Sequence, residues 1–264
     1  MKDFCIILMF DKKFLNKSWE TIKQIRTIGK YDGDIVCIIA DNLASCQYLL
    51  YKDDRVYIKH FKQYGTAPIL KDLRKLPPTA EQREVVKQCF PMHQKMIHYH
   101  KFYIFHRWFK EQYKKCFYID TGTQIFKPLD KMINLDCTGK LLAHSNAHPL
   151  YKEDDKLYTQ FDKVIYPDLY EELSFDYNLD VDHFQATVLL FDTSIIKDNT
   201  FFELMYLAYK YVNSKTNDQA IMNLYFHDNW QQFPIKDEET YYYDFFERGN
   251  LHKTDYIMVK YPQT

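Results

Sequence analysis

The sequence has few glycines and prolines, which excludes several kinds of chain. Only 6 of its 264 residues are Gly and 9 are Pro, whereas collagen-like chains and flexible linkers are rich in one or both. The formal net charge is -1, so the chain lacks the basic field that holds nucleic-acid phosphates, and we expect no nucleic-acid partner. The motifs GxGxxG, HExxH and GxSxG and the Walker lysine loop are absent as well.

Long apolar runs and paired cysteines are also missing. The run at residues 4–10 is far shorter than the roughly 20 residues of a membrane helix. We therefore expect a soluble protein without a membrane span, while a signal anchor on a longer parent chain stays open. The six Cys residues are scattered without a CxxC pair. This pattern favours a reducing, cytoplasmic location with free thiols over disulfides or structural zinc.

Aromatic residues, in contrast, are abundant, with 23 Tyr, 20 Phe and 3 Trp. Hydrophobic residues make up 46% and charged residues 27%, which is ordinary for a globular protein. A chain of this size buries roughly three quarters of the surface of its unfolded form. Aromatic side chains can stack on sugars or bases, and they also fill cores; the core is the more frequent use.

The chain alternates between short apolar runs and helical periodicities. Strands are expected at residues 4–10, 34–40, 56–59, 116–119, 140–143 and 184–191, and helices at 19–28, 96–113, 200–212 and 217–226. Thr200 and Glu203 suggest a capping box, and Asn217 suggests a helix cap. Alternating strands and helices predict an α/β fold with a mostly parallel sheet flanked by helices.

Neither a linker nor an internal repeat divides the chain. We therefore expect a single domain over residues 1–264, with a nucleotide-binding half at about 1–125 and an acceptor half at about 126–264. Residues 62–94 contain several prolines and are expected to form a long loop. Residues 151–182 are polar, acidic and aromatic, and show no clear period.

The most informative stretch runs from Tyr113 to Thr123 and contains Phe-Tyr-Ile-Asp-Thr-Gly-Thr, followed by Lys-Pro-Leu-Asp. Asp120 ends a central strand of this stretch. Ligands of parallel α/β sheets bind at the carboxyl ends of the strands. A carboxylate there can hold a divalent cation on a nucleotide diphosphate. Read alone, Asp120 has the alternative role of a helix cap or turn residue before Gly122.

This stretch resembles the Asp-x-Asp region of GT-A glycosyltransferases, especially the glycogenin and lipopolysaccharide-galactosyltransferase type of family 8. Two later stretches resemble that family in the same order. Asp182-His183-Phe184-Gln185-Ala186-Thr187 is similar to its Asp-Tyr-Phe-Asn-Ala-Gly, and the segment from Asn217 to Asn223 is similar to its Asp-Gln-x-x-Leu-Asn. Together the three stretches imply a GT-A fold over residues 3–235, a Rossmann-like mixed sheet flanked by helices.

The resemblance also implies roles for individual residues. Phe10, Asp11, Lys101, Asp120 and Gly122 would bind the nucleotide, with Asp120 as the metal ligand. Lys101 stands about three residues further from Asp120 than in the family. The residues that would bind sugar or acceptor are His144, Asn146, Asp182 and Gln185, although Gln185 could instead be a polar residue of a partly buried strand. Asp218 and Gln219 would be catalytic, stabilising an oxocarbenium-like sugar; a helix-terminal charge and a surface residue are their structural alternatives.

Two departures concern the metal. Gly122 stands where the family has its second Asp, and Val259 stands where the family has a late His. Mn²⁺ or Mg²⁺ would then be held loosely through Asp120. Lys260 is a candidate cation in its place, provided that the strand directs it toward the site. His144 and His148 could form a metal pair only on a helix, and Pro149 favours a loop that contacts the donor sugar.

The resemblance implies a glycosyltransferase that moves a hexosyl group from a nucleotide sugar, UDP-linked, to a glycan or protein hydroxyl with retention. The acceptor is expected to lie against residues 151–182, where Tyr151, Tyr158, Phe161 and Tyr166 could stack on a sugar. The alternative is a non-catalytic nucleotide-sugar or glycan-binding module that kept the fold. A sugar nucleotidyltransferase is less well supported, because no Gly-rich, Arg-containing loop follows the first strand.

Overall fold

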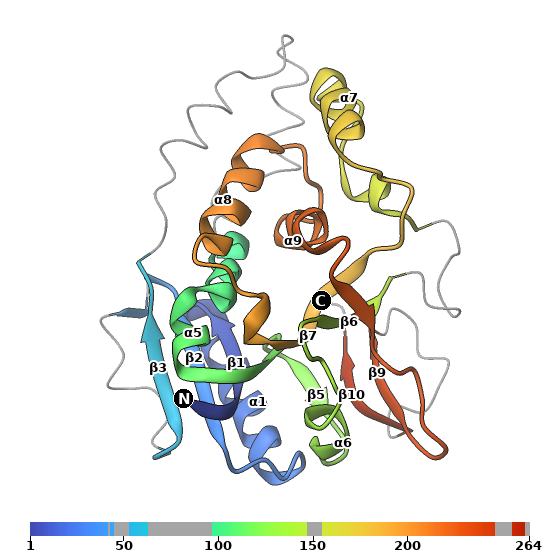
Figure 1. Ribbon diagram of the computed structural model, residues 1–264. Helices are drawn as coiled ribbons and strands as arrows, with labels where there is room; N and C mark the ends of the chain where they lie inside the picture. Colours follow the sequence, from blue (N-terminus) through green and yellow to red (C-terminus); the bar gives the residue numbers. More distant parts are fainter. Residues whose placement is uncertain (42, 45–52, 63–96, 147–154, 246–254, 262–264) are drawn as a thin grey trace.

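The computed structural model describes residues 1–41, 43–44, 53–62, 97–146, 155–245 and 255–261. Its centre is a seven-stranded sheet in the order β3-β2-β1-β4-β7-β6-β8 (Figure 1). The strands are β1 (Lys2–Phe10), β2 (Asp34–Ile39), β3 (Val56–His60), β4 (Tyr113–Ile119), β6 (Leu141–Ser145), β7 (Phe184–Asp192) and β8 (Trp230–Gln232).

The first four strands of this order are parallel, and only β7 runs against its neighbours β4 and β6. The sheet therefore has one edge at which β1, β4 and β6 end and β7 begins. The pairing of β6 with β7 slips at Ala143/His144, so that Leu189 and Gln185 of β7 face consecutive residues of β6. Such irregularities redirect side chains and occur near functional sites.

The two faces of the sheet pack against different helices. Alternate residues of β1 divide between two apolar clusters, because successive side chains of a strand point to opposite faces. One cluster includes residues of α8 (Thr200–Lys210) and α9 (Asp218–Phe226), and the other includes residues of α1 (Leu15–Thr27) and α6 (Asp130–Ile133). Figure 1 shows these pairs of helices on opposite sides of the sheet.

A second, three-stranded sheet has the order β5-β10-β9 and packs with α1 and α6. Its strands are β5 (Thr123–Ile125), β9 (Tyr241–Phe245) and β10 (Tyr256–Lys260). β5 follows Asp120 after one turn, and β10 pairs with it in antiparallel register, with Lys260 opposite Thr123. This pairing brings the last described strand to the turn that follows β4.

Short helices complete the described chain. They are the 3-10 helices η1 (Lys12–Phe14), η3 (His100–Phe105), η4 (Leu157–Gln160) and η5 (Thr193–Ile195), together with α5 (Arg107–Gln112) and α7 (Pro167–Asp176). No helix among the described residues is long and apolar enough to span a membrane.

All six expected strands and three of the four expected helices are confirmed. The expectation of one continuous helix over residues 96–113 is wrong. The described part is helical at 97–99, continues as η3, breaks at His106 in an extended conformation and resumes as α5. His106 starts the new helix by accepting a hydrogen bond from the Trp108 amide. Tyr113 already belongs to β4.

The two capping expectations also need correction. Asn199, not Thr200, precedes α8, and the Thr200 hydroxyl accepts a hydrogen bond from the Lys197 amide, which lies before the helix. Asn217 does precede α9, but its side chain makes no capping bond and its backbone has a positive φ of 53°. The expected loop at 62–94 falls, apart from Lys62, outside the described residues.

Candidate active site

The candidate site lies at the sheet edge where β4 ends and β7 begins. Asp120 follows the last residue of β4, and its amide donates to the carbonyl of Thr187 at 2.8 Å. Its carboxylate accepts a hydrogen bond from the hydroxyl of Tyr118. Tyr118 and Asp120 are two positions apart and so point to the same face, which explains their contact.

Lys101 of η3 is the centre of the site. Its Nζ lies 2.8 Å from Oδ2 of Asp218 and 3.3 Å from Oδ1 of Asp120, and it donates to the carbonyl of Ala186 at 3.1 Å. His98 also contacts Asp218, because its Nδ1 lies 3.2 Å from Oδ1 of that carboxylate. One buried ammonium therefore joins the end of β4 to the first turn of α9.

The electrostatics of this cluster keep its central groups charged. Burial opposes the ionised form of Asp218, but Lys101 and His98 outweigh it and lower the pKa of the carboxyl to about 2. Burial likewise opposes the charged form of Lys101, and the carboxylates of Asp120 and Asp218 reverse this effect and raise its pKa. Burial and the nearby Asp120 raise the pKa of Tyr118, which stays a neutral donor.

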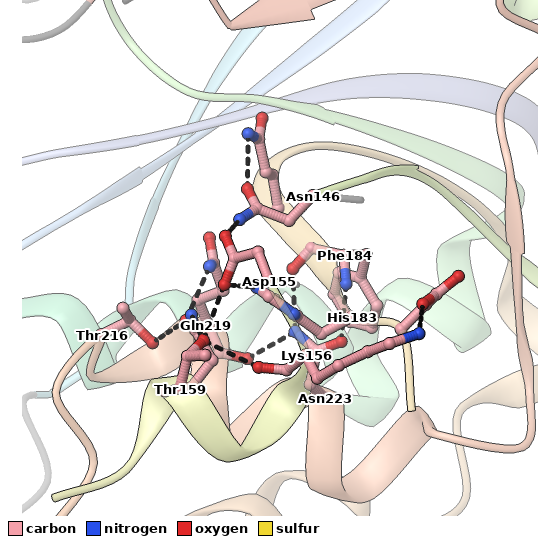
Figure 2. Close-up of polar contacts among 12 residues, drawn as sticks. Asn146, Asp155, Lys156, Thr159, His183, Phe184, Thr216, Gln219 and Asn223 are labelled. Carbon is pink, nitrogen blue, oxygen red and sulfur yellow. Dashed lines mark hydrogen bonds and ion pairs between the residues drawn. The ribbon is translucent and has the colours of Figure 1, made fainter. Parts of the chain in front are cut away.

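The peptide group of Ala186 is held from both sides. Its carbonyl receives Lys101, and its amide donates to Oε1 of Gln219 at 3.2 Å. Asn223, one turn further along α9, hydrogen-bonds both the amide and the carbonyl of Phe184 at 2.8 Å. α9 is therefore fixed along the start of β7 by Asn223 and Gln219 (Figure 2). Its first turn, with Asp218, lies at the same edge as Asp120, because both carboxylates contact Lys101.

Gln219 has a second partner in η4. Its Nε2 donates to Oε1 of Gln160 at 3.0 Å, and the same oxygen accepts from the Thr216 hydroxyl at 2.6 Å (Figure 2). Asp218 and Gln219 are thus neighbours in sequence but have different surroundings. Asp218 belongs to the Lys101 charge cluster, whereas Gln219 orients a backbone amide and an amide side chain.

A second polar chain lies beside this site and comprises Gln185, Asn146, Asp155 and Thr159. Gln185 Nε2 donates to Asn146 Oδ1 at 2.8 Å, Asn146 donates to Asp155, and the Thr159 hydroxyl donates to Asp155 at 2.7 Å (Figure 2). Oε1 of Gln185 is buried and has no hydrogen-bond partner among the described residues. Gln185 and Asn146, both expected to contact sugar, therefore contact each other.

Lys260 approaches Asp120 from the other side. Its Nζ donates to the carbonyl of Thr121 at 2.6 Å and lies 3.8 Å from Oδ2 of Asp120. Gly122 adopts a φ of +81°, a conformation that favours glycine. A Cβ at Gly122 would come no closer than 3.7 Å to Cδ of Lys17 and 3.8 Å to Nζ of Lys260.

These residues do not fit a divalent cation at Asp120. On a diphosphate, Mn²⁺ and Mg²⁺ take one or two carboxylates together with phosphate oxygens and waters, and the described residues contain no group of three or more His, Cys, Asp or Glu side chains that could hold a metal ion without the diphosphate. Ammonium groups approach Asp120 at 3.3 and 3.8 Å instead. Like unit charges about 4 Å apart repel by about 4 kcal/mol at an effective dielectric constant of about 20, and a dication doubles this repulsion.

The remaining expected site residues lie in several environments. Phe10 is buried at the carboxyl end of β1, and Asp11 follows it and caps η1 through the Phe14 amide. His144 is buried in β6 with its ring edge-to-face against Tyr243. Asp182 is exposed and pairs with Lys156 at 2.6 Å.

Two of the aromatic side chains expected to contact the acceptor, Phe161 and Tyr158, differ in their exposure. Phe161 is only 1% exposed and belongs to the core, so the expectation that it stacks on a sugar is wrong. Tyr158 is 39% exposed and is accessible to a ligand. Tyr151 and His148 lie outside the described residues.

Three contributors were missed by the sequence reasoning: His98, Lys17 and Gln160. His98 precedes Lys101 by three residues, a spacing that places both on one helical face, so this signal was available. Lys17 and Gln160 carry no comparable signal, because their positions depend on the packing of α1 and η4 against distant segments.

Comparison with solved structures identifies the fold. The chain is similar to the apo structure of WbbM, a bifunctional glycosyltransferase, with a TM-score of 0.61 and 17% identity over 100% of this chain and 46% of that one. It is also similar to the galactosyltransferase LgtC in complex with donor and acceptor sugar analogues, with a TM-score of 0.57 and 13% identity over 97% and 86%. No protein-family model and no curated sequence matches the chain.

These similarities show that the chain has the GT-A glycosyltransferase fold. The expected fold class and the resemblance to the galactosyltransferase type are confirmed. The chain spans about half the length of the WbbM chain, so the rest of that bifunctional protein has no counterpart in the match.

Proposed function

We propose that this chain is a glycosyltransferase that moves a hexosyl group from a nucleotide sugar, UDP-linked, to a hydroxyl of a glycan or protein with retention. The observation that carries the proposal is the buried Lys101, which joins Asp120 at the end of β4 to Asp218 at the start of α9. Its place at the carboxyl edge of a GT-A sheet supports a ligand site, because open α/β sheets bind ligands at this edge. The LgtC structure, which contains donor and acceptor sugar analogues, supports the same class of substrates.

The charges of the site match the charges of the reaction. When the bond between the anomeric carbon and the diphosphate oxygen breaks, negative charge grows on the diphosphate and positive charge grows on the sugar ring. Lysine ammonium groups near Asp120 stabilise the first, and the carboxylate of Asp218 stabilises the second. Fixed charges in a dry site are effective because they need no reorganisation during the reaction.

Gln219 and Gln185 supply hydrogen-bonding groups rather than charge. Gln219 is held by Ala186 and Gln160, so the second hydrogen of its Nε2 has a defined direction for a sugar oxygen. The buried Oε1 of Gln185 can accept from a hydroxyl once the Gln185–Asn146 contact rearranges. A site that hydrogen-bonds hydroxyl groups discriminates strongly against analogues that lack them.

A screen of nucleotide sugars tests the proposal. The full chain is incubated with UDP-, GDP-, CDP-, ADP- and dTDP-hexoses, with and without Mn²⁺, and release of the nucleoside diphosphate is measured. We expect slow hydrolysis of at least one donor and faster release with a suitable sugar acceptor. Tight binding without release would favour the alternative of a non-catalytic binding module. Neither binding nor release of any donor would overturn the proposal.

A further inference from the structure

We propose that Lys260, together with Lys17, binds the diphosphate of the donor directly and takes the place of a divalent cation, while Lys101, whose three donors are engaged by Asp218, Asp120 and Ala186, adds positive charge nearby. This inference rests on the proposed function, because it concerns the diphosphate of the same site. It follows from the disagreement between the expected metal at Asp120 and the groups that surround this carboxylate.

The position of Lys260 is set by the backbone. β10 pairs with β5, and Lys260 lies opposite Thr123, the first residue after the Asp120-Thr121-Gly122 turn. Its Nζ donates to the Thr121 carbonyl at 2.6 Å. The ammonium is therefore held against the turn and is only 4% exposed as a residue. An exposed lysine would lose this precision through its rotamer freedom.

The charges around the turn favour an anion. Lys17, Lys101 and Lys260 contribute three positive charges, against two negative charges from Asp120 and Asp218. Burial lowers the pKa of Lys260, and the like charges of Lys101 and Lys17 lower it further, while the carboxylate of Asp120 acts in the opposite direction and only partly offsets them. A diphosphate anion beside Lys260 would relieve both penalties, whereas a divalent cation would add to them.

Gly122 leaves room for this contact. A Cβ on Gly122 would meet nothing nearer than 3.7 Å, and its two nearest neighbours are the side chains of Lys17 and Lys260. The Gly122 amide is already held by the Thr21 hydroxyl at 3.0 Å, so the turn is fixed from α1. Gly122 therefore has no carboxylate, and the side chains of Lys17 and Lys260 lie beside it. This arrangement is the one expected of an anion site.

The test measures how Mn²⁺ and the lysine side chains each affect diphosphate binding by the 264-residue chain. Binding of UDP, GDP, CDP, ADP and dTDP, and of the corresponding nucleosides, is measured by calorimetry in EDTA and in Mn²⁺. The variants are Lys260→Met, which keeps length and removes charge, and Lys260→Arg, which keeps charge. Lys127→Met is the matched control, because Lys127 contacts Asp255 of the same region but lies outside the site.

We expect at least one diphosphate to bind in EDTA at least about tenfold more tightly than its nucleoside, with little change on adding Mn²⁺. Lys260→Met should lose about tenfold or more in diphosphate affinity and keep its nucleoside affinity. Lys260→Arg, which keeps the charge in a differently shaped group, should retain more of the diphosphate affinity than Lys260→Met, and Lys127→Met should remain within about threefold of wild type.

Other outcomes separate the two proposals. Diphosphate binding that requires Mn²⁺ overturns the inference and leaves the proposed function standing, as does unchanged binding by Lys260→Met. If no diphosphate binds under either condition, the proposed function fails and the inference fails with it. If Lys260→Met does not fold, the comparison of EDTA with Mn²⁺ on the wild-type protein still decides whether the metal is needed. The variant Lys17→Gln then takes the place of Lys260→Met in testing whether lysine charge contributes to diphosphate binding.

Discussion

The Nζ of Lys101 lies 2.8 Å from Oδ2 of Asp218, and both residues are at most 5% exposed. This ion pair joins η3 to α9 across the start of β7. A buried pair contributes little compared with apolar packing, but removing one partner leaves an uncompensated buried charge. The pair is therefore expected to be sensitive to single substitutions and tolerant of a matched double substitution.

A double-mutant cycle checks this relationship. Asp218→Asn should lower the free energy of unfolding by about 3 kcal/mol, the lower end of the range for broken buried pairs, because Lys101 keeps Asp120 as a partner. Lys101→Met should lower it by at least as much, because it removes the cation from both carboxylates. The combined variant should lose clearly less than the sum of the two losses. Urea unfolding provides the measurement. Additive losses would mean that the two groups do not interact appreciably.

The core strands and three of the long helices were predictable because their signals are local. An apolar run or a 3.6-residue period is visible in the sequence itself, as in β1 and α8. The break at His106 was not predictable, because its apolar spacing fits a continuous helix and the change to η3 depends on tertiary packing. A hydrophobic period therefore located this segment but did not specify its geometry.

The site divides in the same way. The resemblance to the glycosyltransferase motifs is enough to select Asp120 and Asp218 as site residues. In the structure both carboxylates contact Lys101, which supports placing them in one site. The approach of Lys260 depends on the pairing of β10 with β5. The hydrogen bond from the Ala186 amide to Gln219 joins α9 to the part of β7 where the pairing with β6 slips. Both are contacts between distant segments, and a single sequence contains no direct signal for them.

Gln219→Ala tests whether Gln219 acts on the sugar. The variant removes the acceptor of the Ala186 amide and the donor to Gln160, so unfolding should require about 1–3 kcal/mol less free energy. If Gln219 also contacts the sugar in the transition state, kcat should fall about tenfold or more while nucleoside diphosphate affinity changes little. Steady-state kinetics and calorimetry separate these quantities.

Gln112→Ala is the control for this variant, because Gln112 is exposed at the end of α5. It should leave both stability and kinetics near wild type. A loss of diphosphate affinity in Gln219→Ala that matches the loss of kcat would assign the residue to nucleotide binding instead.

Among the described glycines, Gly122 and Gly139 have a positive φ and form a natural pair for testing the turn after β4. Gly122 has a φ of +81° and Gly139 a φ of +65°, and neither offers a steric obstacle to a Cβ. Alanine at either position should cost about 1–2 kcal/mol of stability from backbone strain alone. Only Gly122→Ala should also weaken diphosphate binding, because its methyl group enters the space beside Lys260. Equal binding by the two variants would place the diphosphate elsewhere.

The pH dependence of diphosphate binding provides the last prediction. Burial and neighbouring lysines lower the pKa of Lys260 below its ordinary value of 10.5. As the pH rises through this lowered pKa, Lys260 loses its charge and the wild-type affinity for the diphosphate should fall. Lys260→Arg keeps its charge, because the guanidinium pKa exceeds about 12, so its affinity should fall later.

The lowered pKa of Lys260 affects the stability of the fold in the opposite direction from diphosphate binding. Between the lowered pKa and 10.5 the unfolded chain binds more protons at Lys260 than the folded chain does, so this contribution to the free energy of unfolding rises with pH. Between the lowered pKa of Lys260 and pH 10.5, the wild-type protein should therefore lose diphosphate affinity relative to Lys260→Arg. Over the same pH range its free energy of unfolding should rise relative to that variant. Titration of the nucleotide itself is common to both proteins and cancels in the comparison. Calorimetry and urea unfolding between about pH 7 and 10 check it, and a parallel decline in affinity for the two proteins would exclude Lys260 as the diphosphate cation.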